Sequence, residues 1–220
     1  MRIGHSILAL LSVALLFTAC SDDENGGGHY PSVYTELVEI ISDDRGKACE
    51  LRTDADESFP LSADLSALKL EFNDTVRCIC IFERKDDNTI NLYSCQKIVA
   101  PKPAKAEKFP NGIKSDSIYF QSIWRSGHYV NFHFQMMGKD KAHYLHMIED
   151  TLMLNPNGRH TLRLRLYHDQ NKDTKAFHLD SYVSVPLRDY ERRGTMKKGD
   201  TIAISANTYD NGSQTWKVAY

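Results

Sequence analysis

Residues 130–136 read Val-Asn-Phe-His-Phe-Gln-Met, and residues 162–167 read Leu-Arg-Leu-Arg-Leu-Tyr. In both stretches apolar side chains alternate with polar ones, so each predicted strand has one apolar face and one polar face. This period of two is typical of antiparallel strands that cover a core on one side and meet solvent on the other. Both stretches therefore predict β structure in the second half of the chain.

The strand pattern continues on either side of these two stretches. Turn signals that contain Asn-Gly separate the strands, as at residues 155–158 and 210–212. The predicted strands are 117–124, 128–137, 142–149, 161–168, 176–187, 200–208 and 214–220. Strands of this number and length within roughly 100 residues predict an immunoglobulin-like β-sandwich. We assign residues 109–220 to it, although the Cys, Trp and Cys core of antibody domains is missing.

The first half of the chain predicts a second β module over residues 30–108. Its expected strands are 33–41, 49–52, 76–82 and 90–99. The strand at 76–82 is apolar on both faces, so we expect it to be buried on both sides. One short helix is expected at 64–72. Residues 100–108 hold two prolines and alternating lysines, which is typical of an extended connector. The chain is thus predicted to be all-β.

Four of the five cysteines, Cys49, Cys78, Cys80 and Cys95, lie in this first module. A hairpin turn centred at residues 87–88 would place Cys80 opposite Cys95. Opposed residues in antiparallel strands lie ~4.5–5.5 Å apart at Cα, which a disulfide can bridge. Four buried free thiols are the alternative. A zinc site is disfavoured, because Cys78-x-Cys80 is shorter than the Cys-x2–4-Cys spacing of structural zinc sites.

The N-terminus predicts export and lipid attachment. Residues 1–19 contain a basic residue and a short apolar run, too short for a lasting membrane span of ~20 residues. Thr18-Ala19-Cys20 resembles a bacterial lipobox, which would make Cys20 the lipidated first residue of the mature protein. Residues 20–29 are acidic and glycine-rich and predict a flexible tether. Such acids after the lipidated cysteine resemble a signal for the outer face of the outer membrane; the alternative is a periplasm-facing lipoprotein.

Several segments together resemble the NigD-like lipoprotein family of Bacteroidetes. The matching segments are the lipobox at Cys20, the β module that ends near Val99, and residues 129–134, 143–147, 162–168 and 184–187. The resemblance implies that the first module is an OB-like barrel followed by a β-sandwich. It implies no catalytic residues, and it suggests a bacteriocin-associated or immunity role only through the family's name.

One polar stretch has the spacing of a calcium loop. Asp169, Asn171, Asp173 and Asp180 match positions 1, 3, 5 and 12, where oxygen ligands converge on the ion. Position 6, however, is Thr174 where such loops need glycine. We therefore expect a polar hairpin between strands 161–168 and 176–187, with the calcium loop as the alternative.

The remaining candidate residues predict no catalytic site. The seven histidines after residue 127 are expected to be isolated surface residues, and the acidic run 54–57 and basic run 192–198 to be solvated loops. A nucleophile elbow, a His-Glu-x-x-His motif and paired carboxylates are missing from the sequence. The formal net charge of −2 does not favour a nucleic-acid partner. We expect a non-enzymatic envelope lipoprotein without a cofactor that binds a glycan or a protein; the alternative is a glycan- or peptide-acting enzyme.

Overall fold

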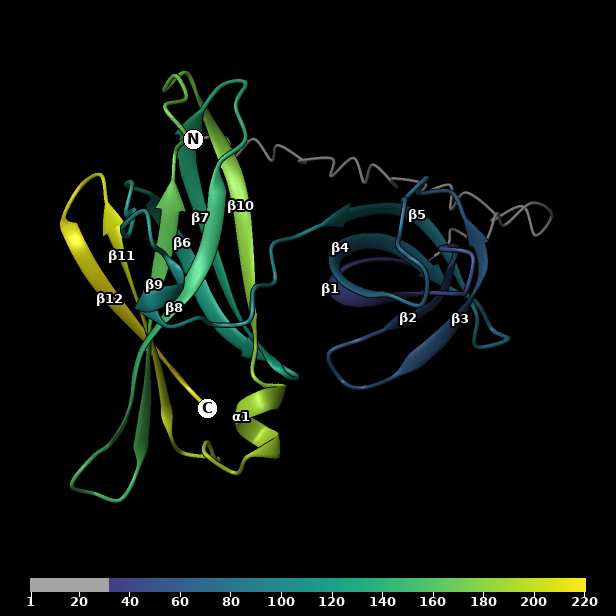
Figure 1. Cartoon of the computed structure of the whole chain (residues 1–220). Coiled ribbons are helices and arrows are strands. Elements are labelled where there is room, and N and C mark those ends of the chain that lie inside the picture. The colour runs from purple at the N-terminus through teal and green to yellow at the C-terminus, as the bar shows by residue number, and fades with distance from the viewer. Residues whose placement is uncertain (1–31) are drawn as a thin grey trace, which may run out of the picture. The chain divides into compact units, whose positions relative to one another are not determined.

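Five strands close into a barrel at the start of the described part of the chain, which is residues 32–220 of this computed structural model. The strands are β1 (Val33–Ser42), β2 (Ala48–Arg52), β3 (Ser58–Asp64), β4 (Thr75–Arg84) and β5 (Ile90–Lys97). Their order around the barrel is β1-β2-β3-β5-β4, and β4 pairs back onto β1 (Figure 1). Only the β3–β5 pairing is parallel among these. The predicted OB-like barrel is confirmed.

Two local features of the barrel differ from the sequence analysis. β3 was not among the predicted strands, and it contains Pro60, a residue that is depleted in strands. Phe59 nevertheless packs in the barrel core, and Pro60 is tolerated opposite Glu50. The short helix expected at residues 64–72 is absent from the described structure. Leu68 and Leu70 instead pack against the barrel core two residues apart, which is the spacing of an extended segment.

Seven further strands form a sandwich of two sheets. They are β6 (Tyr119–Ser126), β7 (Tyr129–Gly138), β8 (Tyr144–Leu154), β9 (His160–Asp169), β10 (Phe177–Pro186), β11 (Thr201–Thr208) and β12 (Gly212–Ala219). One sheet has the order β10-β7-β6 and the other β12-β11-β9-β8. All seven strands predicted for this module are present, and the predicted sandwich is confirmed.

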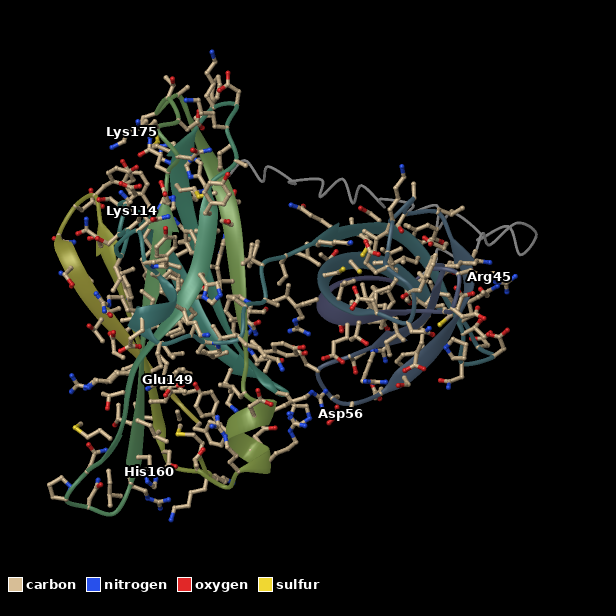
Figure 2. All side chains as sticks on the ribbon, viewed as in Figure 1. Arg45, Asp56, Lys114, Glu149, His160 and Lys175 are labelled. Carbon is tan, nitrogen blue, oxygen red and sulfur yellow. The ribbon has the colours of Figure 1, made fainter. Side chains whose placement is uncertain are left out.

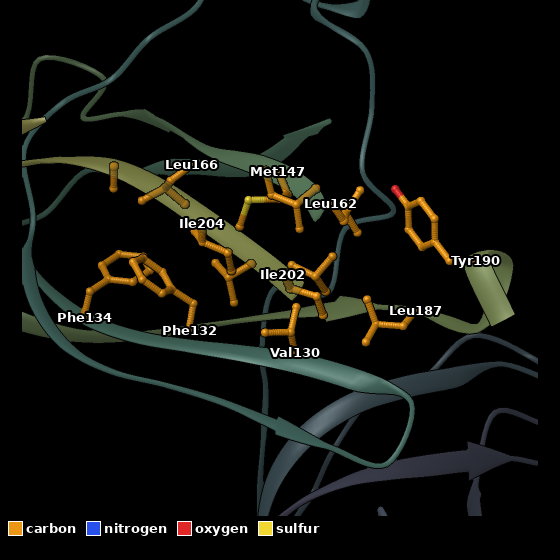
Figure 3. Packing of buried hydrophobic residues seen from close by; sticks show 14 of the residues in the cluster. Val130, Phe132, Phe134, Met147, Leu162, Leu166, Leu187, Tyr190, Ile202 and Ile204 are labelled. Atoms are coloured by element: carbon orange, nitrogen blue, oxygen red, sulfur yellow. The ribbon is translucent and has the colours of Figure 1, made fainter. Parts of the chain in front are cut away.

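Apolar faces of the two sheets meet in the sandwich core. Val130, Phe132 and Phe134 of β7 lie on one side of this core, and Leu162 and Leu166 of β9 lie on the other (Figure 3). These are the alternating residues that predicted the strands. Tyr190 closes one end of the core from a single-turn helix, α1 (Arg188–Arg192), which the sequence did not predict.

The expected hairpin between residues 161–168 and 176–187 is also wrong. β9 and β10 belong to different sheets, so the segment between them crosses from one layer of the sandwich to the other. Polarity and turn residues predict where the chain bends, but they do not determine whether the next strand joins the same sheet or the facing one.

The connector from β5 to β6 pairs with sandwich strands on its way. Val99 bridges to Val183 of β10, and Ala104 bridges to Ile148 of β8 just before a short 3-10 helix, η1 (Ala106–Lys108). These pairings support our proposal that the sandwich module begins after Lys97, within the connector that the sequence assigned to the first module. The predicted signal peptide at 1–19, the predicted lipidation site Cys20 and the predicted tether at 20–29 lie outside the described residues.

Candidate functional site

The four calcium-loop candidates have separate roles in the structure. Asp173 is buried, and its carboxylate accepts backbone N–H bonds from Lys139 (2.5 Å) and Thr174 (2.8 Å). Asp180 lies on β10, with its Oδ1 3.0 Å from Nε2 of His133. Asp169 accepts a hydrogen bond from the backbone of Asn171 at 2.8 Å. Within residues 32–220, the acids of this set do not form a three-carboxylate group with metal-binding spacing.

Two histidines expected at the surface are buried instead. His143 Nδ1 lies 2.9 Å from His168 Nε2, and His168 Nδ1 lies 2.9 Å from the backbone oxygen of Asp116. Asp173 lies at the other end of this chain of groups, 3.4 Å from His143 Nε2. Burial lowers the pKa of His168 below its usual range, partly opposed by the Asp116 carbonyl. The prediction of isolated surface histidines is therefore wrong for this pair.

The predicted strand register in the barrel is confirmed at the cysteines. Cys80 on β4 pairs with Cys95 on β5, and their Sγ atoms lie 3.1 Å apart as free thiols. Cys78, two residues earlier on the same face of β4, is buried beside them. The Cys80–Cys95 disulfide stays a prediction.

A buried arginine connects the barrel to the sandwich. The guanidinium of Arg77 on β4 donates two hydrogen bonds, of 2.5 and 2.8 Å, to the two carboxylate oxygens of Asp54. It also lies 4.0 Å above the ring of Tyr129, and its Nε donates to Ser184 on β10 at 3.4 Å. The prediction of a solvated acidic loop at 54–57 is therefore wrong for the side chain of Asp54, whereas residues 55–57 are exposed. No local pattern identifies this pair, because its partners lie 23 residues apart.

A second buried charge lies beside this arginine. Glu39 of β1 accepts a hydrogen bond of 2.6 Å from the Tyr129 hydroxyl. Arg52 and Arg188 lie 3.4 and 3.6 Å from the same carboxylate. Burial and the hydrogen bond to Glu39 raise the pKa of Tyr129, so the hydroxyl stays protonated and donates. Arg77, Glu39 and Tyr129, with the partners just named, form what we call the polar junction.

A hollow of about 370 Å³ lies next to the polar junction. Barrel and sandwich both line it, with Thr35, Glu36, Leu37, Asp54 and Ile79 from the barrel and Trp124, Ser126 and Tyr182 from the sandwich. A smaller hollow of about 160 Å³ adjoins it and shares Ile79 and Tyr182. Asp56, labelled in Figure 2, belongs to the same β2–β3 loop as Asp54 and pairs with His128 at 3.1 Å. We take the larger hollow as the candidate site.

Aromatic and polar groups meet in this hollow. The ring of Tyr182 stacks on that of His133, with centroids 4.2 Å apart and an interplanar angle of 5°, so its orientation is fixed. Trp124 adds a second half-buried aromatic side chain from β6. The hydroxyls of Thr35 and Ser126 and the carboxylate of Glu36 offer hydrogen-bonding groups. Such a surface can stack against an apolar ring face and hydrogen-bond to its substituents.

The sequence found parts of this site but not their combination. It placed the strands that carry Trp124 and Tyr182, and it assigned His133 to the polar face of its strand. Nothing in it indicated that Glu36 and Ile79 of the barrel would complete the hollow.

The described residues contain no helix that is both long and apolar enough to cross a membrane.

Solved structures of Bacteroides proteins are similar to this chain. A NigD-like immunity protein from Bacteroides caccae is 27% identical, with a TM-score of 0.69 over 86% of this chain and 93% of that one. A protein of unknown function from Bacteroides vulgatus is 16% identical, with a TM-score of 0.64 over 86% and 91%. A candidate lipoprotein from Bacteroides fragilis is 14% identical, with a TM-score of 0.55 over 86% and 97%. The last two show a shared fold alone.

The comparison with family models assigns the second module directly. The search of curated proteins found no match. Residues 98–220, more than half of the chain, match the model described as the NigD-like C-terminal beta sandwich domain. The match begins directly after β5, which ends at Lys97, and covers all seven sandwich strands. The chain therefore belongs to the NigD-like family.

Proposed function

We propose that this protein is a non-enzymatic envelope lipoprotein that binds a carbohydrate in the hollow between its barrel and its sandwich. The observation that carries the proposal is that two aromatic side chains, Trp124 and Tyr182, and the carboxylate of Glu36 line the same hollow. Its volume of about 370 Å³ lies within the ~300–1,000 Å³ usual for small-molecule sites. One or two sugar rings fit a space of this size.

Sugar recognition uses both kinds of group that the hollow offers. The C–H face of a pyranose ring is apolar and packs on an aromatic ring, while its hydroxyls need donors and acceptors. Glu36 suits this role, because no hydrogen-bond or ion-pair partner of its carboxylate is found among residues 32–220. Its strand, β1, pairs with β4 at this position, where Glu36 lies opposite Cys80, and this pairing holds the backbone of the site in place.

The state of the second carboxylate supports binding rather than hydrolysis. Glycoside hydrolysis generally needs two carboxyl groups that act as acid and as base or nucleophile. Both carboxylate oxygens of Asp54 accept hydrogen bonds from Arg77, so the charge of Asp54 is paired and its oxygens are occupied. Among the residues that line the hollow, Glu36 is the other carboxylate, and one carboxylate does not make the pair that hydrolysis needs. None of the similar solved structures named above carries the name of an enzyme.

The carbohydrate proposal is tested by screening the purified protein against surface glycans and by titrating any glycan that binds. Trp124→Ala and Tyr182→Ala should each weaken binding about 10-fold, since one aromatic contact contributes ~0.5–1.5 kcal/mol. Tyr144→Ala, which removes an aromatic side chain exposed elsewhere, is the matched control and should bind normally. Failure to retain any glycan, or equal binding by all three variants, would refute the proposal.

Membrane attachment through Cys20 is the second part of this proposal. The bacterial anchor carries several acyl chains, so its attachment should be durable, unlike that of a single chain. The name of the Bacteroides fragilis relative supports it. Cys20→Ala should release the protein into the soluble fraction, and unchanged membrane fractionation would contradict it. Digestion of intact cells by an external protease separates the outer-surface location, which we favour, from a periplasm-facing one.

An immunity role is a second candidate function. The Bacteroides caccae relative is named as an immunity protein, and its identity of 27% extends over 86% of this chain. Deleting the gene should then raise sensitivity to a bacteriocin, and complementation should restore resistance. Unaltered sensitivity would remove this candidate.

A further inference from the structure

Three cysteine sulfur atoms gather inside the barrel, on the opposite face of β4 from Ile79, which lines the carbohydrate site proposed above. The Sγ atoms of Cys78, Cys80 and Cys95 all lie within 4.8 Å of one another. Cys78 and Cys80 are completely buried, whereas Cys95 is partly exposed and gives solvent a route to the group. We call these three residues the thiol trio.

The barrel's strand pairing brings the trio together. Cys78 and Cys80 are two residues apart on β4, so both side chains point into the core. Cys95 lies directly opposite Cys80 on β5 and diagonally from Cys78. At Cys78 and Cys80, β4 is paired with β1 on one side and β5 on the other, and Cys95 is held by the pairing of β5 with β4, so the fold positions the backbone of all three residues.

The three sulfur atoms also interact with one another. The thiol of Cys80 donates a hydrogen bond to Sγ of Cys95 at 3.1 Å. Hydrogen bonds with Cys80 and Cys95 lower the pKa of Cys78, and the interaction with Cys78, together with burial, raises the pKa of Cys80 and of Cys95. The three sulfur atoms therefore face one another in the barrel core.

We propose that the reduced thiol trio binds one soft monovalent metal ion, of which Cu(I) is the example, inside the barrel. Thiolates are the protein ligands that such ions prefer. Three sulfur atoms at ~2.3 Å from a central ion, in one plane, lie ~4 Å from each other. The observed separations run from 3.1 Å to at most 4.8 Å, so small side-chain rotations suffice.

The number of ligands favours a monovalent ion over zinc. Structural zinc sites are four-coordinate. The group that the fold brings together within residues 32–220 has only three members, and no histidine or carboxylate joins it. Each thiol that coordinates as a thiolate releases one proton, so uptake of the ion should acidify a weakly buffered solution.

The test is a titration with Cu(I), without oxygen, of the reduced full chain carrying Cys20→Ala. We expect one ion per chain by native mass spectrometry, with thiolate-to-copper charge-transfer absorption in the ultraviolet. Cys78→Ser, Cys80→Ser and Cys95→Ser should each weaken binding about 100-fold in competition with a Cu(I) chelator. Cys49→Ser removes an exposed cysteine outside the trio and is the matched control, which should bind one ion as before.

A second measurement keeps the test decisive if a serine variant fails to fold. In the unsubstituted trio, bound Cu(I) should slow alkylation of Cys78, Cys80 and Cys95 while Cys49 still reacts at its usual rate. Absence of binding by the reduced chain, or loss of binding with Cys49→Ser, would overturn the proposal. The predicted Cys80–Cys95 disulfide uses two of the same sulfur atoms, so oxidised protein should take up no ion until it is reduced.

Discussion

The barrel and the sandwich are both built from β-strands, but their buried cores differ in size and in composition. The buried apolar cluster of the sandwich has 16 residues, with Phe132 and Phe134 at its centre. That of the barrel has 10, and two of these are Cys78 and Cys80. A small core gives a small margin of stability. The barrel also uses the polar junction with the sandwich, in which Arg77 and Glu39 are buried.

This difference separates two ways in which the modules are stabilised. The sandwich depends mainly on apolar packing within itself. The barrel depends partly on buried charged groups whose contacts are complete only when both modules are folded, because Arg77, besides its pair with Asp54, contacts Tyr129 and Ser184 of the sandwich. We therefore expect damage at the polar junction to loosen the barrel more than the sandwich. The four predictions below test this comparison, from the largest expected effect to the smallest.

Truncating the centre of the sandwich core should have the largest effect. Phe132 is fully buried and contacts Phe120, Phe134 and Trp216. Phe132→Ala should lower the free energy of unfolding by about 4 kcal/mol, because it leaves a cavity in a packed core. Chemical denaturation measures this. Phe177→Ala, at a position 62% exposed, is the control and should cost well under ~1 kcal/mol. Similar losses for both variants would contradict the assigned core.

Removing the buried arginine should have the next largest effect. Arg77→Ala leaves the Asp54 carboxylate without its partner in a partly buried place, at a cost of about 3 kcal/mol. Hydrogen exchange should show faster opening of barrel amides than of sandwich amides. Arg45→Ala, which breaks only exposed ion pairs, should change stability by less than ~0.5 kcal/mol. Equal loosening of both modules would refute the difference we infer between them.

A glycine at the junction offers a sharper comparison with a matched partner. Gly127 has φ +51°, and a Cβ there would clash with the backbone oxygen of Asp54. Gly158 has φ +74° with open space around it. Both alanine variants should cost ~1–2 kcal/mol from the left-handed backbone. Gly127→Ala should cost about 1 kcal/mol more, because the Asp54 backbone must move. Equal losses in thermal unfolding would show that this close approach is absent in solution.

Acidification should produce the smallest effect, and within the sandwich. The pKa of His168 is lowered by burial, so its contribution to stability is complete above its usual value of ~6.5 and is lost as the pH falls below it. His143, Asp116, Asp169 and Asp173 are the titratable groups around it. His168→Gln should flatten the fall in unfolding free energy just below pH 6.5. His178→Gln, at an exposed position, should leave it unchanged, and an unaltered slope in His168→Gln would contradict the assignment.

The sequence by itself determined most of the strands and which of their faces are apolar. The alternation around Phe132 and Leu164 is a local property, because successive side chains in a strand point to opposite faces. The sequence also placed Cys80 opposite Cys95. In the structure, Arg84 pairs with Ile90 next to the hairpin turn. If that register continued without interruption along both strands, Cys80 would lie opposite Ser94 instead of Cys95. An irregularity between Ile81 and Phe82 restores the cysteine pair, and no sequence pattern indicated it.

Only the tertiary structure decided how distant polar groups are satisfied. Asp54 belongs to an acidic run, and His143 and His168 to polar stretches, so each resembled an exposed residue. Their partners are set by which strands and loops meet, over separations of 23 residues for Asp54–Arg77 and 25 for His143–His168. A buried charged or polar side chain is tolerated only where the fold supplies an opposite charge or a hydrogen-bonding group beside it. The periodicity of the sequence indicates which face of each strand is apolar. Which strands and loops then meet, and so which polar groups become partners, is determined by the tertiary structure.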